Sequence, residues 1–522
     1  MTRIRSALQG AAALLAAAAT AIVSSIATAT PAHADAAVPP VNSSILVTGR
    51  GWGHGIGMSQ YGAWGAAEAG LSFEEILDFY YAGTSLGSLT TGNTIRVWIS
   101  ADSDNRLHVV PASGLRITDS AGRVWRMPTG SAYKQWRISR SGDVRVLHYK
   151  NADGNWVKKA TTLSSSRNWS VSNPDSGYVI VRLPNGTSRD LRQNVSLRFT
   201  SSGAKTVNTL TMENYLKSVV PAEMPASWHG EALKAQSVAA RSYAARSRTN
   251  SSSPIYDVCD TTYCQVYKGL ATRSGSTRSV HEQAPTNTAI TATANKVVKA
   301  GSSVALTMFS SSNGGHAASG GTSYLTAHPD PYDAKMRNPA WSKPISASTI
   351  QNAYPSIGTL RSVRVTARDG QGPWGGRATS VTILGSKSSI TLNGGQFKSK
   401  FGLKERLFLI VGGYKPGTGN YDRWQALGGT PSWVGAPTAS EKVVSSGLAA
   451  TFEDADLFWS SATGSRYLTG PARAAYAALG GPSSALGFPK ADTVKDSTGT
   501  VTDFQVGRIR CLTGAACVVS YG

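Results

Sequence analysis

The sequence predicts a β-rich α+β fold that is divided into several domains. Short runs of alternating polarity, separated by Gly, Asn and Asp, fill residues 115–200 and are typical of strands joined by hairpins. Helical patterns occupy residues 72–81 and 209–248, and strand patterns return between about 297 and 411. A chain of 522 residues exceeds what one hydrophobic core usually holds, so we expect two or three domains.

The N-terminal segment has the pattern of a secretory signal. Two arginines precede a nearly continuous apolar stretch at residues 7–29, and small residues flank His33 at the positions that a signal peptidase reads. We therefore expect residues 1–34 to be a signal peptide that is removed on export. An uncleaved membrane anchor is the alternative, because the apolar stretch is long enough to span a bilayer loosely. No later stretch approaches ~18 uninterrupted apolar residues, so no membrane span is expected after cleavage.

The four cysteines form two local pairs. Cys259 and Cys264 are five residues apart, and Cys511 and Cys517 are six apart. Export to an oxidising compartment favours two disulfides. A zinc site formed by Cys259, Cys264 and His281 is the alternative, although the C-x4-C spacing alone is weakly diagnostic of zinc.

The composition is basic, with 52 Lys and Arg against 30 Asp and Glu and a net charge of +22. Residues 421–522 carry equal numbers of basic and acidic residues, so the excess lies in the larger, N-terminal part of the chain. An anionic partner is indicated. Nucleic acid is disfavoured, because the charges are dispersed and no nucleic-acid-binding motif is present. The sequence also lacks the HExxH, GxSxG and P-loop motifs.

Residues 49–57 carry glycine at every second position. This spacing leaves one face of an extended strand bare, so another backbone or a flat ligand can approach it closely. His54 lies in this stretch and is either a site residue or a structural residue of a glycine-rich turn.

Glu223 is a second candidate, and it lies between the two halves of the helical pattern at residues 209–248. Pro221, Pro225 and apolar residues flank it. Such surroundings disfavour the charged carboxylate and raise its pKa towards values that suit a general acid. A helix-capping or solvent-exposed glutamate is the alternative, since glutamate is rarely buried.

Several motifs coincide with those of one bacterial family. They are GRGWGHGIGMSQYGA at 49–63, MENYL at 212–216, VVPAEMP at 219–225, EALKAQ at 231–236, AARSYA at 239–244, CQVYKG at 264–269 and FSSSNGG at 309–315. With these motifs, residues 46–110 and 195–411 resemble the SpoIID/LytB family of cell-wall proteins. In many members the first motif closes the domain, whereas here it opens it. This difference indicates a circularly permuted order, which is tolerable when chain termini lie close together.

The resemblance also suggests domain boundaries. We expect a SpoIID/LytB-like domain at residues 46–411, with residues 115–195 as a β-rich insertion that matches no family motif. An internal repeat, ALGGTP…VGAP at 426–437 and ALGGP…ALGFP at 478–489, resembles LGFP modules. It marks residues 420–522 as a module that attaches to the bacterial cell wall.

The resemblance implies a secreted, cell-wall-associated lytic transglycosylase that cleaves peptidoglycan glycan strands at N-acetylmuramic acid. One carboxyl, here Glu223, would protonate the glycosidic oxygen and then take a proton from the sugar's 6-hydroxyl, which closes a 1,6-anhydro ring. Arg241 is expected to orient Glu223 or to contact the substrate. The expected sugar-contacting residues are His54, Ser59, Gln60, Gln265 and Tyr267. Glu213 and Glu231 lie nearby in sequence and keep a hydrolase as an open alternative.

A non-catalytic role is the main alternative. The LytB branch of the family is linked to stimulation of an N-acetylmuramoyl-L-alanine amidase, and the repeats alone would supply tethering to the wall. The expected partners are peptidoglycan glycan strands, anionic wall polymers such as teichoic acids, and a cell-wall amidase. No cofactor or metal is expected.

Overall fold

The computed structural model describes residues 34–40, 43–89, 93–334, 340–414 and 417–522. The predicted signal peptide lies outside these residues except for its last position. The described ranges contain both helices and strands, and strands make up the larger share. This confirms the predicted β-rich α+β fold. Within these ranges no helix is long and apolar enough to cross a membrane.

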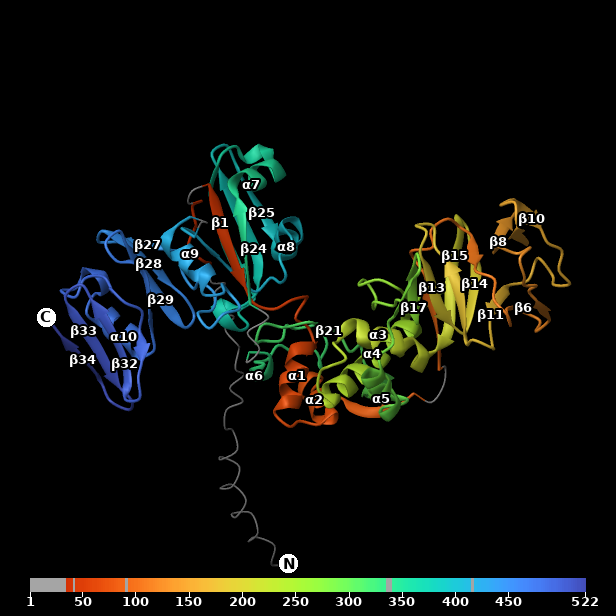
Figure 1. Cartoon of the computed structure of the whole chain (residues 1–522), viewed down its shortest axis with the longest axis horizontal. Coiled ribbons are helices and arrows are strands. Elements are labelled where there is room, and N and C mark those ends of the chain that lie inside the picture. The colour runs from red at the N-terminus through yellow and green to blue at the C-terminus, as the bar shows by residue number, and fades with distance from the viewer. Residues whose placement is uncertain (1–33, 41–42, 90–92, 335–339, 415–416) are drawn as a thin grey trace, which may run out of the picture.

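Two large sheets form a sandwich, which lies at the right of Figure 1. One sheet has the strand order β10-β9-β8-β5-β12-β13-β17-β18, and the other has the order β16-β4-β15-β14-β11-β6-β7. The strands of the first sheet are β5 (Leu107–Val109), β8 (Gln135–Ser141), β9 (Val144–Lys150), β10 (Trp156–Lys158), β12 (Tyr178–Arg182), β13 (Ser188–Arg192), β17 (Ala271–Ser274) and β18 (Thr277–Val280). Those of the second are β4 (Thr94–Trp98), β6 (Arg116–Asp119), β7 (Val124–Arg126), β11 (Trp169–Ser172), β14 (Asn194–Thr200), β15 (Gly203–Thr211) and β16 (Val258–Cys259).

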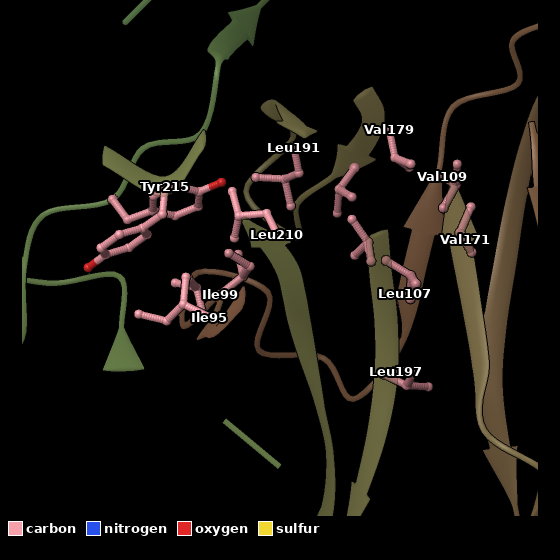
Figure 2. Packing of buried hydrophobic residues seen from close by; sticks show 14 of the residues in the cluster. Ile95, Ile99, Leu107, Val109, Val171, Val179, Leu191, Leu197, Leu210 and Tyr215 are labelled. Carbon is pink, nitrogen blue, oxygen red and sulfur yellow. The ribbon is translucent and has the colours of Figure 1, made fainter. Parts of the chain in front are cut away.

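One hydrophobic core joins the two sheets to the helices. Figure 2 shows side chains from both sheets in this core, among them Val109 and Leu197, with Tyr215 of the helical segment packed at its end. The strands of residues 115–195 are β-rich as expected, but they do not form a sheet of their own. They pair with flanking strands, since β8 pairs with β5, β13 with β17 and β14 with β15.

The central helices are α3 (Met212–Glu223), α4 (Gly230–Asn250) and α5 (Ala284–Ala292). Helix α4 presents the small-residue face that its sequence predicts, and Leu233, Ser237, Ala240 and Ala244 are all buried. The side chain of His229 caps this helix by accepting the amide of Glu231. Helix α3 continues through a proline to end at Glu223, so its last turn delivers this carboxyl to the surface of the helical layer.

The N-terminal motif pairs with strands from the later part of the chain. Strand β1 (Ser44–Gly49) pairs with both β22 (Trp341–Ser346) and β26 (Phe408–Val411). The glycine-rich segment follows and leads into β2 (Met58–Ser59), which runs parallel to β21 (Phe309–Ser310). Two short helices come next, α1 (Gln60–Glu68) and α2 (Phe73–Tyr80). The first motif of the chain therefore lies against a segment about 250 residues later.

Smaller elements complete this part of the molecule. Strands β3 (Ser85–Ser88), β19 (Lys296–Ala300) and β20 (Ser303–Val304) form one sheet, and β23 (Leu360–Arg368), β24 (Ala378–Gly385) and β25 (Ser389–Asn393) form another. The remaining helices here are α6 (Pro331–Ala334), α7 (Ala347–Ala353) and α8 (Gly394–Phe401).

The C-terminal region contains two similar units, which lie at the left of Figure 1. The first has helix α9 (Gly419–Ala426) and strands β27 (Lys442–Val444), β28 (Gly447–Thr451), β29 (Ala455–Ser460) and β30 (Gly464–Thr469). The second has helix α10 (Pro471–Ala478) and strands β31 (Val494–Lys495), β32 (Gly499–Phe504), β33 (Gly507–Leu512) and β34 (Cys517–Ser520). One helix with a four-stranded sheet in each unit agrees with the internal repeat of the sequence.

The first of these units shares a core with the preceding domain. Leu46 of β1 and Val411 of β26 are buried in one cluster with Trp424 and Val434. An ion pair adds to this contact, because Arg50 of the glycine-rich motif donates from Nε to Glu453 at 2.9 Å. The first C-terminal unit is therefore packed onto β1 and the start of the glycine-rich motif.

Both expected disulfides are present. Cys259 is bonded to Cys264, and Cys511 is bonded to Cys517. His281, the third ligand of the alternative zinc site, contacts the hydroxyl of Thr272 at 2.7 Å instead. Cys259 and Cys264 thus form a disulfide in this structure, and they do not form the alternative zinc site with His281.

Replacing Gly57 by alanine tests the close packing of the glycine-rich motif. Gly57 has a φ of +67°, and a Cβ there would lie 2.1 Å from the carbonyl oxygen of Met308. We expect Gly57→Ala to lower the free energy of unfolding by about 3 kcal/mol, from left-handed strain plus overpacking. Gly70→Ala is the control, because its φ is +93° but the space around it is open, and it should cost about 1 kcal/mol. Equal losses in urea denaturation would contradict the packing argument.

Candidate functional site

A cavity of about 400 Å³ opens between the glycine-rich motif, the end of α3 and β21. Its lining residues are Trp52, Gly53, His54, Gln60, Glu223, Tyr243, Thr262, Tyr263, Cys264, Met308, Phe309, Ser310 and Ser311. Glu223 is the sole carboxylic acid among the described residues that line it. The structure thus brings together three of the residues that the sequence singled out: His54, Gln60 and Glu223.

Glu223 is half-buried and held by hydrogen bonds. The backbone amide of Val266 donates to its Oε1 at 3.0 Å, and the side-chain amide of Gln60 donates to the same carboxyl. Burial raises the pKa of Glu223 above its ordinary value, while these two hydrogen bonds and the nearby Lys268 act in the opposite direction. Burial is the largest effect, so Glu223 keeps its proton to a higher pH than an ordinary glutamate, as its sequence context predicts.

His54 also lines the cavity, and it is uncharged at neutral pH. Burial, followed by the positive charge of Lys398, lowers its pKa to about 4. Its Nδ1 accepts the amide of Ile56 at 2.9 Å, and the ring is also hydrogen-bonded to the backbone of Phe309. His54 therefore lines the cavity and at the same time ties the glycine-rich turn to β21.

Ser59 is buried beneath the cavity and does not line it. Its hydroxyl caps α1 by accepting the amide of Gly62 at 3.0 Å, and it donates to Asp333 at 2.6 Å. Ser312 and the amide of Gly315 donate to the other oxygen of Asp333. Ser59 thus holds the N-terminal motif against the segment after β21.

Gln265 and Tyr267 are also buried, and they fix the loop that supplies the Val266 amide. Gln265 accepts the hydroxyl of Tyr215 at 3.0 Å and donates to the carbonyl of Ala240. Tyr267 stacks on Tyr215 and donates to Asn208 at 2.6 Å. Their side chains position the loop that holds Glu223 instead of lining the cavity.

Arg241 is fully buried in α4 and is bonded to Glu213 in α3. Its Nε and Nη2 donate to the two oxygens of Glu213 at 2.9 and 2.7 Å. Arg241 therefore does not bind Glu223 itself, and it does not line the cavity where it could contact a substrate. The pair joins the first turn of α3 to α4, so Arg241 acts on Glu223 only by fixing the helix that carries it.

Glu231 is likewise occupied away from the cavity. It forms an ion pair with Lys234 at 2.6 Å and accepts the amide of Phe73 at 2.9 Å. These interactions outweigh burial and lower the pKa of Glu231. Glu213 and Glu231 were the two further carboxylates that left hydrolysis as an alternative reaction. Neither of them lines the cavity.

Comparison with known proteins agrees with this arrangement. Residues 200–299 match the family model of the stage II sporulation protein, SpoIID, and residues 434–484 match the model of the LGFP repeat. The chain contains a SpoIID domain and an LGFP repeat. The first match covers α3, α4 and the Val266 loop, which are the elements that position Glu223.

Three relatives share part of this sequence. The chain is 40% identical over 127 residues to the amidase enhancer of Bacillus subtilis (strain 168), which covers 23% of this chain and 16% of that protein. It is 30% identical over 183 residues to an uncharacterized protein of Brachyspira hyodysenteriae (strain ATCC 49526 / WA1), covering 34% and 47%. It is 51% identical over 43 residues to the stage II sporulation protein D of B. subtilis (strain 168), covering 8% and 12%. The matches span less than half of each relative, and they support a cell-wall-related function.

Two exposed aromatic residues that line the cavity were not predicted from the sequence as site residues. The side chains of Trp52 and Tyr263 line the cavity and are 53% and 90% exposed. Lys404 lies over the Trp52 ring at 4.3 Å. Trp52 belongs to the first family motif, but Tyr263 has no signal beyond its place between two bonded cysteines.

Asp333 lies in a buried network that supports the cavity wall. Burial and the neighbouring Asp330 raise the pKa of Asp333 from 3.8 to about 6. The folded chain therefore binds this proton more tightly than the unfolded chain. The resulting stabilisation is complete below about pH 4 and is lost as the pH rises through about 6.

Asp333→Asn should remove this pH dependence. Between pH 4 and 7, the wild-type free energy of unfolding should fall by about 2–3 kcal/mol relative to that of the variant. Urea denaturation of both proteins at several pH values measures the difference. Because His54 is present in both, its own titration cancels, and parallel pH profiles would show that Asp333 does not titrate in this range.

Proposed function

We propose that the protein is an exported lytic transglycosylase that cleaves the glycan strands of peptidoglycan at N-acetylmuramic acid. The observation that carries this proposal is a single half-buried carboxyl, Glu223, in a cavity of the SpoIID domain. Its raised pKa favours the protonated form, which a general acid must supply. The resemblance of the motif around Glu223 to the family's catalytic motif points to the same residue.

The proposed reaction needs one acid and no water. Glu223 donates its proton to the bridging oxygen as the bond between that oxygen and C1 of the muramic acid breaks. The sugar's own 6-hydroxyl oxygen then bonds to C1, and its proton returns to the Glu223 carboxylate. The products are a strand with a free 4-hydroxyl and a strand ending in a 1,6-anhydro ring.

A second carboxylate would favour ordinary hydrolysis. Retaining and inverting glycosidases use two carboxyl groups placed roughly 5 to 9.5 Å apart across the bond. Among the described residues that line the cavity, Glu223 has no such companion. Glu213 is paired with Arg241 and Glu231 with Lys234, so neither is available as a water-activating base.

The surroundings of Glu223 suit a sugar strand. Trp52 and Tyr263 offer exposed ring faces beside the cavity, and the apolar faces of sugar rings pack on such surfaces. Gln60 and the uncharged His54 add polar groups within the same cavity. The LGFP repeat supports attachment of the whole protein to the cell wall.

Stimulation of an amidase is a second candidate function. It is favoured by the 40% identity to a protein named amidase enhancer. In this case the cavity would bind glycan without cutting it, and the product of the partner amidase would increase. The two functions differ in their products, because an amidase releases peptides and a transglycosylase releases anhydro-sugar ends.

Glu223→Gln tests the enzyme directly. The amide keeps the shape of the side chain but has no proton to donate, so formation of anhydromuramyl ends should fall by about 10²- to 10⁴-fold. Mass spectrometry of purified peptidoglycan digested with each protein measures these ends. Glu74→Gln, which changes an exposed glutamate of α2, is the matched control and should leave the rate unchanged.

Full activity of Glu223→Gln would overturn the transglycosylase proposal. If neither wild type nor variant forms anhydro ends, and both increase peptide release by an added amidase, the enhancer function is the correct one. Circular dichroism of the two variants confirms that the fold is retained.

Trp52→Ala and Tyr263→Ala test the proposed sugar-binding walls. Each should raise KM for glycan strands about five- to tenfold with a smaller effect on kcat, because a stacked aromatic contact contributes roughly 1 kcal/mol to binding. Tyr521→Ala is the control, since Tyr521 is 57% exposed but lies at the C-terminus. Unchanged KM values in both cavity variants would show that the substrate does not contact these rings.

A further inference from the structure

A row of basic side chains crosses the eight-stranded sheet of the sandwich. Residues paired directly across neighbouring strands form this row, one from each strand. In strand order they are Lys158, His148, Arg137, His108, Arg182, Ser188, Arg273 and Arg278. Seven of these eight positions hold Lys, Arg or His.

The row lies on the outer face of the sheet. Residues directly opposite each other in adjacent strands share a face, and their sequence neighbours point to the other face. The neighbours Trp136, Leu147 and Val181 are buried in the core between the two sheets. Lys158 and Arg182 are exposed, as expected for residues that point away from this core.

The positive charge is not cancelled along most of the row. Arg273 and Arg278 both bind Asp190, at 2.7 and 2.8 Å, so that end of the row is largely neutralised. The other end of this eight-residue row differs, because Lys158, Arg137 and Arg182 form no ion pair with any described residue. From here on, the name cationic row refers to these three residues alone.

The spacing of the cationic row is regular. Its residues lie on β10, β8 and β12, and one strand separates each from the next. Neighbouring strands are about 4.8 Å apart, so positive charges recur roughly every 9 to 10 Å along a line across the sheet. His148 and His108 fill the intervening strands, and Asp104 contacts His108 at 3.2 Å.

The middle of the cationic row is held in place by an aromatic ring. The guanidinium of Arg137 lies 4.2 Å from the centre of the Trp156 ring, and His108 contacts the same ring at its edge. Arg137 Nε and the Nδ1 atoms of His108 and His148 are buried and have no hydrogen-bond partner in the described part of the protein. The ring thus fixes the guanidinium of Arg137, and a guanidinium is suited to bind an anionic oxygen through its remaining N–H groups.

We propose that this face binds a linear wall polymer of phosphodiester-linked repeats. Charge complementarity favours a chain of separate anionic groups, because the cations are spaced along a line and not gathered in one pocket. The LGFP repeat and the amidase-enhancer relative favour a cell-wall polymer over nucleic acid. The proposal concerns the outer face of the sandwich and does not depend on Glu223.

Poly(glycerol phosphate) is the probe for this proposal, with binding to the exported chain measured by titration calorimetry at several salt concentrations. The variant is Arg137→Gln/Lys158→Gln/Arg182→Gln. It should bind the probe at least about 10-fold more weakly than wild type. The slope of log K against log salt should also fall by about 2, if each lost contact contributes roughly 0.7 as in single-stranded polyanions.

The matched control removes three positive charges elsewhere, as Arg361→Gln/Lys387→Gln/Lys400→Gln. All three of these side chains are exposed and lie on or beside β23 to α8. It should weaken binding less than about 2-fold, since only the long-range field of the protein changes. Equal losses in the two triple variants would overturn the proposal, because net charge alone would then explain binding.

Three further measurements keep the result unambiguous. The double variant Lys158→Gln/Arg182→Gln keeps Arg137 stacked on Trp156. A loss of affinity for the polymer between those of wild type and the triple variant, with an unchanged circular dichroism spectrum, supports binding at the cationic row even if the triple variant folds poorly. Double-stranded DNA is tested in parallel, and tighter binding to DNA than to the polymer, lost in the same variants, would replace the wall polymer by nucleic acid. Cleavage of polymer-free glycan should be equal in wild type and all these variants, which separates this surface from the Glu223 site.

Discussion

The close approach of the glycine-rich motif to the segment after β21 is the contact on which the rest of the site depends. Trp52 and Ser312 exchange two backbone hydrogen bonds, and Gly55 accepts the amide of Ala318 at 2.8 Å. A Cβ on Gly55 would lie 2.2 Å from the guanidinium of Arg377. Arg377 in turn binds the carbonyls of Asn313 and His316. Only a backbone without side chains fits between these groups, and this fit places Trp52, His54 and Gln60 around Glu223.

The other wall of the site is built from the sandwich side. Tyr215 of α3 packs at the end of the sandwich core. It also donates a hydrogen bond to Gln265 and stacks on Tyr267, and both of these residues belong to the loop that binds Glu223. The carboxyl is therefore held between two rigid layers that are distant in sequence. Its partial burial, and so its raised pKa, follows from this packing more than from any one neighbour.

Local signals in the sequence predicted much of the fold. The helical pattern at residues 72–81 corresponds to α2, and the alternating runs form strands of the sandwich. The proline-flanked context of Glu223 indicated its raised pKa correctly. The roles of Ser59 and Gln265 could not be predicted in this way, because a motif residue that touches substrate and one that holds a neighbouring loop give the same pattern in a single sequence.

Long-range contacts were equally hidden from the sequence. The alternating runs at 115–195 show strands but not their partners, and some of these partners lie outside the expected insertion on both sides. The cationic row becomes visible only when strand register is known, since its three residues are spread along the sequence over 45 positions, from Arg137 to Arg182. Register depends on how whole strands pack, and a composition of scattered lysines and arginines does not reveal it.

The core shared by β1, β26 and the first C-terminal unit has a mechanical consequence. Since Leu46 and Trp424 are buried together and Arg50 is bonded to Glu453, the first C-terminal unit packs directly against the residues next to Trp52. An enzyme on a loose tether sweeps a sphere around its point of attachment. Under the proposed function, a rigid connection instead holds Glu223 at one distance and one angle from the C-terminal unit, so the point of attachment itself would select which stretch of the wall comes within reach.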